Sequence, residues 1–312
     1  MDPRTWTTDS GIWAQEVGEG PLVALVHGSM DRSGGMLRVR RLLQSSHRVL
    51  RYDRRGYARS LGAGPPDSFE QQVDDLAGLL AGRPAVLLGH SFGGLVCLAL
   101  AERRPELARA VLAYEAPKMW APWWPGSSAG SGALAVARAG AGVAGRAATG
   151  DAPGDSAPGA ADPARGAVTA SGEAADPTGA HARVTAEEAE LGAEAAEWFL
   201  RRMIGDAMWE RLPAAVRAER RAEGPTLVAE MASVRPPAPP PFDAATIPVP
   251  VLAVHGSEAR AHHVRATGEL ARSAPRAELR AIAGAGHGAH LSHPVELADL
   301  VHRAAALAEG RP

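Results

Sequence analysis

Short apolar runs that end at glycine or at charged residues limit most strongly the folds open to this chain of 312 residues. Residues 21–26, 48–52 and 84–88 are near-continuous apolar runs of strand length. Such runs are typical of strands that are covered on both faces in a parallel sheet. Residues 68–80 lie between two of them, begin with a serine suited to capping a helix and have apolar side chains at helical spacing.

The same alternation continues after this first part of the chain. Residues 110–114, 249–254 and, more weakly, 277–282 form further apolar runs, and a final helix is expected over about residues 294–308. Strands alternating with helices at this spacing predict an α/β fold with right-handed crossovers. We expect a mostly parallel open sheet flanked by helices.

A long interruption, residues 117–245, separates the fourth run from the fifth. Residues 126–182 are mostly Gly, Ala, Ser, Pro and Asp, a composition that predicts a flexible or disordered segment. Residues 184–234 have helical character and begin with Thr185 and Glu188, the spacing of a capping box. We therefore expect residues 1–116 and 246–312 to form the core and residues 117–245 to form an inserted lid.

Composition excludes several classes of function. The formal net charge is only −2, so no overall field favours nucleic acid or an anionic membrane. Cys97 is the one cysteine, which excludes an intrachain disulfide, a thiolate zinc site and an iron–sulfur cluster. Nucleotide-binding glycine motifs are missing, and His262 and His263 have no carboxylate or thiolate neighbour at metal-ligand spacing. We expect no cofactor, no metal and no partner beyond a small-molecule substrate, with the oligomeric state left open.

The beginning of the chain lacks a basic stretch followed by an apolar run, so no signal peptide is expected. No apolar run reaches the roughly 18–20 residues of a membrane span. These features predict a cytoplasmic protein that does not bind membranes.

The motif that carries most chemistry is GHSFGG at residues 89–94, between a predicted strand and a predicted helix. A G-x-S-x-G sequence in that place is a sharp turn that exposes its serine, here Ser91, as a nucleophile. The following helix directs N–H groups and the positive end of its dipole toward a developing oxyanion.

Two other glycine-rich segments agree with this interpretation. HGSM at residues 27–30 ends the first apolar run, where a second oxyanion N–H is expected, and Ser29 is the favoured donor. GAGHGAH at residues 284–290 places His287 on a loop from which it could act as general base and then general acid. His290 is the rival histidine.

Together with YDRRGYARS at residues 52–60, these segments resemble the α/β-hydrolase fold superfamily, and its serine esterases and lipases in particular. The resemblance covers about residues 12–116 and 246–308. It implies a nucleophile at Ser91, a base at His287, and an oxyanion hole built from the N–H groups of Ser29 and Phe92. It also implies that Asp53 is a structural turn residue. Separately, we expect the adjacent Arg54 and Arg55 to be charged residues of a loop.

The acid of the triad departs from the commonest pattern of this superfamily, H-G-x-x-D. Residues 255–259 read HGSEA, with alanine where the aspartate is expected. Glu258 is adjacent to that position, whereas Glu115 follows the run 110–114. Catalytic groups gather at the carboxyl ends of such strands. We therefore predict Glu115 as the acid, with Glu258 as the alternative.

The sequence thus predicts a serine hydrolase that acts by acyl transfer through a Ser-His-Glu triad on a carboxylic ester of a small or medium apolar substrate. Met30, Trp120, Trp123 and Trp124 are candidates for lining the substrate pocket, while Trp198 is expected to pack lid helices onto the core. Two alternatives stay open: a non-hydrolytic enzyme of the same fold, such as an acyltransferase, lyase or cyclase of secondary metabolism, and a catalytically weak ligand-binding homologue.

Overall fold

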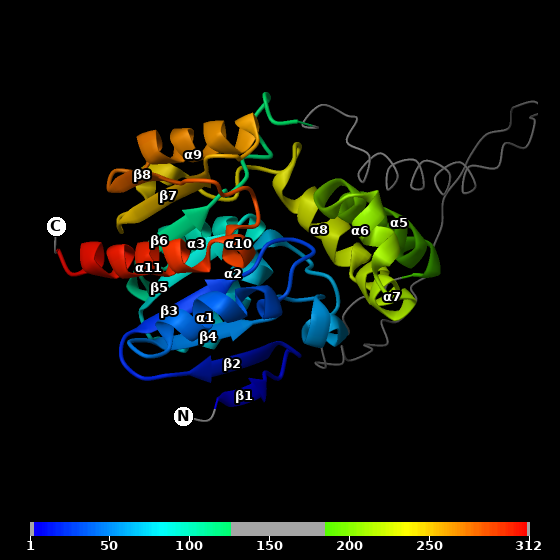
Figure 1. Ribbon diagram of the computed structural model, residues 1–312, viewed down its shortest axis with the longest axis horizontal. Coiled ribbons are helices and arrows are strands. Elements are labelled where there is room, and N and C mark those ends of the chain that lie inside the picture. Colours follow the sequence, from blue (N-terminus) through cyan, green and yellow to red (C-terminus); the bar gives the residue numbers. More distant parts are fainter. Residues whose placement is uncertain (1–2, 126–184, 311–312) are drawn as a thin grey trace, which may run out of the picture.

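An eight-stranded sheet forms the centre of the protein, and the computed structural model describes residues 3–125 and 185–310 (Figure 1). The order across the sheet is β1-β2-β4-β3-β5-β6-β7-β8. The six strands from β4 to β8 in this order run parallel, whereas β1 and β2 are antiparallel to their neighbours. The strands are β1 Arg4–Thr7, β2 Trp13–Val17, β3 Leu22–Val26, β4 Arg48–Tyr52, β5 Ala85–His90, β6 Ala108–Tyr114, β7 Val251–Gly256 and β8 Ala277–Ile282.

Helices cover both faces of this sheet, which confirms the predicted class. Side chains of β5 alternate between the faces: Leu87 packs with α2, α3 and α9, while Val86 and Leu88 pack with α1 and α11. The helices are α1 Leu37–Leu43, α2 Phe69–Leu80, α3 Phe92–Arg103, α9 Ala261–Ser273, α10 Ala289–Ser292 and α11 Pro294–Ala308. Short 3-10 helices are η1 Ser33–Met36, η2 Ala58–Ala63, η3 Pro105–Leu107 and η4 Ala244–Thr246.

Local chemistry explains where the helices begin. The hydroxyl of Ser68 accepts a hydrogen bond of 3.2 Å from the N–H of Gln71, so it caps α2 as predicted. Thr185 and Glu188 form both hydrogen bonds of the predicted capping box, at the start of α5.

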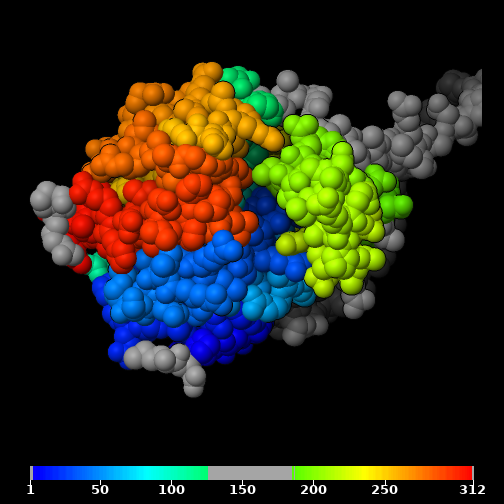
Figure 2. Space-filling model, viewed as in Figure 1, coloured from blue at the N-terminus to red at the C-terminus, as the bar shows by residue number. Residues whose placement is uncertain are grey.

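Among the described residues between β6 and β7, four helices lie over one end of the core, and we call them the helical insertion, residues 186–234. They are α5 Ala186–Ile204, α6 Asp206–Arg211, α7 Ala214–Ala222 and α8 Gly224–Val234. Figure 2 shows the yellow-green insertion beside the core, with a hollow between the two. The segment predicted to be flexible, residues 126–182, lies outside the described residues.

Two buried glutamates attach the insertion to the core. Glu230 of α8 is fully buried and pairs with Arg54, which is only 1% exposed. Glu223, which directly precedes α8, pairs with Arg32 at 2.9 Å. A buried pair needs good geometry to offset the cost of desolvating both charges. The expectation that Arg54 was a loop charge is therefore wrong, because its partner comes from a segment far along the chain.

Two glycines bring α5 and α8 into close contact. A Cβ atom at Gly224 would collide with the carbonyl oxygen of Gly192, and one at Gly192 would lie 2.5 Å from the backbone nitrogen of Pro225. The absence of side chains at both positions therefore allows the two helix backbones to approach.

Several elements lack a clear sequence signal. β1 and β2 are short and partly exposed, so they show no apolar run. Within the stretch 184–234 that was predicted to be helical, α6 ends at Arg211 and α7 begins at Ala214, because the chain turns at Pro213. None of the helices in the described ranges is long and apolar enough to cross a membrane.

Candidate active site

Ser91 lies on a tight turn between β5 and α3. Its backbone has φ 51° and ψ −123°, a conformation that is strained for a residue with a side chain. The turn needs glycine on both sides: a Cβ at Gly89 would lie 2.5 Å from the Cα of Gly94, and one at Gly93 would collide with the carbonyl oxygen of Val26. The backbone N–H of Ser91 donates to the carbonyl oxygen of Tyr114 at 2.9 Å, which fastens the turn to the end of β6.

The residue after β6 is Glu115, and its carboxylate meets His287. Glu115 Oε2 lies 2.6 Å from His287 Nδ1, and Oε1 accepts the N–H of Gly256 at 3.1 Å. Since a carboxylate only accepts, His287 carries a proton on Nδ1, which leaves Nε2 available as a base. Glu258 is exposed, and none of the contacts between described residues joins it to His287.

The environment of Glu115 favours its ionised form. Complete burial of the side chain would raise the pKa of this carboxyl, but the hydrogen bond and the charge of His287 outweigh burial and lower it. The pair is therefore suited to hold a negative charge beside an imidazole that takes up a proton.

His263 is a third member of this group that the sequence did not reveal. Its Nδ1 lies 3.9 Å from Glu115 Oε2, and its ring lies 4.6 Å from that of His287. Burial, followed by the charge of His287, lowers the pKa of His263 to about 3, so its ring is neutral. Spacing along the chain could not indicate this carboxylate neighbour, because Glu115 comes from another strand.

The residues expected to form the oxyanion hole lie beside Ser91. Phe92 is the first residue of α3, so its N–H has no acceptor within the helix. The loop after β3 passes so close that a Cβ at Gly28 would lie 3.0 Å from the Cβ of Ser91. Ser29 follows on this loop, and its hydroxyl donates to Glu230 Oε2 at 2.6 Å.

A cavity of about 330 Å³ is bordered by the predicted nucleophile, base and oxyanion-hole residues. Ser29, Ser91, Phe92 and His287 lie on the core side. The other walls come from the chain after β6, from α5, from the end of α8 and the residue after it, and from the start of α9 and the residue before it. They consist of Pro117, Met119, Trp124, Pro125, Trp198, Phe199, Arg202, Met203, Met231, Arg235, Arg260, His262 and His263.

Of the four residues predicted to line the substrate pocket, only Trp124 is among those that line the cavity beside Ser91. Trp124 lines the cavity of Ser91, whereas Trp120 lines a neighbouring cavity of about 400 Å³. Trp123 packs against Trp124, with the Arg265 guanidinium 4.2 Å from its ring centre. Met30 is buried in the core at φ 55° and is not among the cavity residues. Trp198, expected only to pack helices, does line the cavity.

Comparison with known proteins shows to which family the chain belongs. The sequence profile of the alpha/beta hydrolase family matches residues 23–300. The chain belongs to this family. The curated relative YraK of Bacillus subtilis (strain 168), described as an uncharacterized hydrolase, is 33% identical over 111 residues, which cover 34% of this chain and 41% of the relative. The chain thus matches less than half the length of that relative.

Solved structures of alpha/beta hydrolases share the fold over nearly the whole chain. An esterase from Thermogutta terrifontis is 17% identical with a TM-score of 0.63, over 99% of both chains. An enol-lactonase from Burkholderia xenovorans LB400 is 19% identical with a TM-score of 0.61, over 95% of this chain and 96% of that one. At these identities, the likeness concerns the fold alone. These structures therefore agree with the fold that the family match implies.

Proposed function

We propose that this alpha/beta hydrolase is a serine hydrolase that cleaves carboxylic esters through a triad of Ser91, His287 and Glu115. The observation that carries the proposal is the 2.6 Å contact between Glu115 and His287 Nδ1, since His287 and the strained Ser91 line the same cavity. Nucleophile, base and orienting acid are the three roles that acyl transfer through a serine needs.

The reaction divides into two acyl transfers. Ser91 Oγ attacks the ester carbonyl while its proton moves to His287 Nε2, and the N–H groups of Ser29 and Phe92 bind the oxyanion. The C–O bond then breaks, and the alcohol leaves with the proton from His287. Water attacks the acyl-enzyme with the same base, which releases the acid and restores Ser91.

The walls of the cavity support an ester with an apolar part. Met119, Trp124, Phe199 and Met231 contribute much of the lining, which favours burial of hydrocarbon. Two solved relatives are named as an esterase and an enol-lactonase, and both names refer to ester bonds. This agreement is at the level of the fold.

Two arginines of the cavity add a preference for negative charge. Arg202 and Arg260 are exposed cavity residues, and no ion pair with a carboxylate links either one to the described residues. Arg202 lies over the ring of Trp198 at 5.0 Å, a contact that leaves its N–H groups able to bind a ligand. A substrate with an apolar acyl part and an anionic group would use both kinds of wall.

The proposal is tested with a fluorophosphonate probe and a panel of chromogenic esters. We expect the probe to label Ser91 in the wild type, and Ser91→Ala to lose both labelling and ester hydrolysis. Ester hydrolysis that persists in Ser91→Ala would contradict the serine mechanism. Ligand binding without turnover would indicate a binding homologue, and a product formed only with a non-water acceptor would indicate a transferase.

A further inference from the structure

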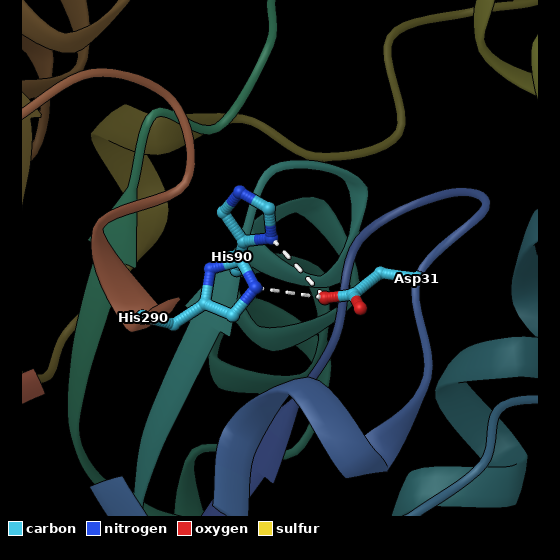
Figure 3. Close-up of side chains that lie close together, drawn as sticks. All are labelled: Asp31, His90 and His290. Carbon is cyan, nitrogen blue, oxygen red and sulfur yellow. Dashed lines mark ion pairs between the residues drawn. The ribbon is translucent and has the colours of Figure 1, made fainter. Parts of the chain in front are cut away.

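A second cluster of side chains lies behind the nucleophile turn: Asp31, His90 and His290. Figure 3 shows both imidazole rings turned toward one carboxylate oxygen, Oδ2 of Asp31. His290 Nε2 lies 3.1 Å and His90 Nδ1 lies 3.8 Å from this oxygen. The two histidines are at most 6% exposed, whereas the side chain of Asp31 is 22% exposed. The triad of the proposed function uses none of the three.

The polar atoms of this cluster face one another without hydrogen bonds. Asp31 Oδ2, His90 Nδ1 and both ring nitrogens of His290 are buried and have no hydrogen-bond partner among the described residues. His290 Nε2 and Asp31 Oδ2 are close enough for a hydrogen bond but do not have its geometry. Buried polar atoms normally have partners, so these four atoms are candidates for binding a ligand or an ion.

Neighbouring backbone groups determine which atoms of His90 and Asp31 have free lone pairs. His90 Nε2 lies 2.9 Å from the carbonyl oxygen of His287, and a carbonyl only accepts, so the neutral ring carries its proton there. Its Nδ1 then directs a bare lone pair toward the cluster. The other carboxylate oxygen, Asp31 Oδ1, accepts the N–H of Arg32 at 2.7 Å. One imidazole lone pair, on His90, and one carboxylate oxygen, on Asp31, therefore face each other.

We infer that Asp31, His90 and His290 form a binding site for a divalent transition-metal ion such as Zn²⁺. Two imidazoles and one carboxylate are ligands that zinc accepts, and water from the exposed side of Asp31 can complete the coordination. Ligands of a tetrahedral ion lie about 3.3–3.5 Å apart. The two measured separations bracket this value, and the three ligand atoms all lie within 4.8 Å of one another.

The pattern of contacts also agrees with a metal site. Ligands that surround one ion point at the ion and not at one another, which explains close atoms without hydrogen-bond geometry. A metal-binding histidine commonly donates its other ring N–H to a carbonyl, as His90 does to His287. Sequence spacing did not indicate this site, because its ligands come from three distant segments.

A metal here would join three segments that carry residues of the candidate active site. Asp31 follows the oxyanion segment after β3, His90 precedes Ser91, and His290 lies three residues after His287. We therefore expect the bound ion to raise thermal stability, since a ligand that binds only the folded state stabilises it. The inference does not depend on the proposed reaction, because its test measures metal binding.

Zinc binding to the full chain, stripped with EDTA beforehand, tests this inference by calorimetric titration. We expect one equivalent of Zn²⁺ in the wild type, and an affinity lower by about 100-fold or more in Asp31→Asn and in His290→Gln. The control His302→Gln removes an exposed histidine beside His47 and should bind as the wild type does.

Three results would overturn the inference: no uptake by the wild type, uptake that both ligand variants retain, or uptake that only Glu115→Gln abolishes. The last would assign the ion to Glu115, His263 and His287, the other group with suitable geometry. If the ligand variants do not fold, anomalous diffraction from wild-type crystals with Zn²⁺ decides. A peak among Asp31, His90 and His290 supports the site, and its absence contradicts it.

Discussion

The hydroxyl of Ser29 donates a hydrogen bond of 2.6 Å to Glu230, a residue 201 positions further along the chain. The loop proposed to bind the oxyanion is therefore held by helix α8 of the insertion. Glu230 also pairs with Arg54 and accepts the hydroxyl of Tyr57 at 2.7 Å. One buried carboxylate thus joins the insertion, the core and the catalytic loop.

Removal of this charge should affect both stability and turnover. We expect Glu230→Gln to lower the free energy of unfolding by about 3 kcal/mol, because the buried charge of Arg54 loses its anionic partner. The kcat for esters should fall as well, because Ser29 loses a charged acceptor. Urea unfolding and ester kinetics measure the two effects.

Two variants separate these effects. Glu223→Gln removes the other buried glutamate of the insertion without touching Ser29, so kcat should stay near the wild-type value. The double variant Arg54→Met/Glu230→Met removes both charges, so stability should largely return while kcat stays low. If kcat also returned, the contact with Ser29 would have no role in turnover.

The identity of the triad acid has a direct kinetic test. Glu115→Gln should lower kcat by about 10⁴-fold, because the amide no longer selects the imidazole tautomer and no longer stabilises its charged form. Glu258→Gln should change kcat less than about twofold, since the exposed Glu258 does not contact His287. The opposite ranking of the two variants would reassign the acid.

The turn that carries Ser91 should not tolerate even one added methyl group. Gly93→Ala would direct its Cβ into the carbonyl oxygen of Val26, so we expect a loss of stability of several kcal/mol or a failure to fold. The matched control is Gly78→Ala on α2, where a Cβ would meet nothing within 4 Å. This substitution should stabilise the protein by about 0.5–1 kcal/mol. Equal melting temperatures for the two variants would refute the prediction.

Acid should destabilise the protein through His27, which is completely buried. Its Nδ1–H donates to the carbonyl oxygen of Gly28 at 2.8 Å, and Nε2 accepts the N–H of Arg54 at 2.8 Å, so the ring is held neutral. Burial, followed by the charge of Arg54, lowers its pKa from 6.5 to about 4.

Between these two pKa values, the unfolded chain takes up a proton that the folded protein does not. Stability from His27 is therefore full above pH 6.5 and falls as pH decreases toward 4, by about 3 kcal/mol in all. Urea unfolding from pH 7.5 to 4 measures the slope, and His27→Asn should make it shallower. An unchanged slope in that variant would show that His27 does not contribute.

Arg202 and Arg260, the two exposed arginines of the cavity, should favour substrates that carry a negative charge. Arg202→Gln and Arg260→Gln should each lower kcat/KM about tenfold, or about 1.4 kcal/mol, for an ester that carries a carboxylate. A neutral ester of the same shape should be little affected. Arg211→Gln, an exposed position outside the cavity, serves as control. Equal losses with charged and neutral esters would indicate a role in packing instead.

Sequence was most informative where the chemistry is local. The turn around Ser91 lies within residues 89–94, and the helix caps and apolar runs are equally short, so their patterns are visible in one stretch. The placement of Glu115 at a strand end also follows from the general rule for parallel sheets.

Features that depend on tertiary contacts were not visible. Arg54 looked like a loop charge because its partner Glu230 lies far along the chain, and His263 showed no carboxylate neighbour for the same reason. Met30 was a candidate for lining the substrate pocket, yet it is buried in the core and has a positive φ. Of two adjacent residues, one can line the cavity, as Ser29 does, while the other is buried in the core, as Met30 is. Spacing along the sequence does not distinguish these two positions.

The contact between Gly192 and Gly224 has a consequence for substrate size. Trp198, Phe199 and Met203 reach the cavity from α5, and these two glycines determine how near α5 lies to α8. An alanine at either position would move α5 outward and widen the space above Ser91. Selectivity for chain length could therefore be re-engineered from a helix contact without altering any residue that touches the substrate.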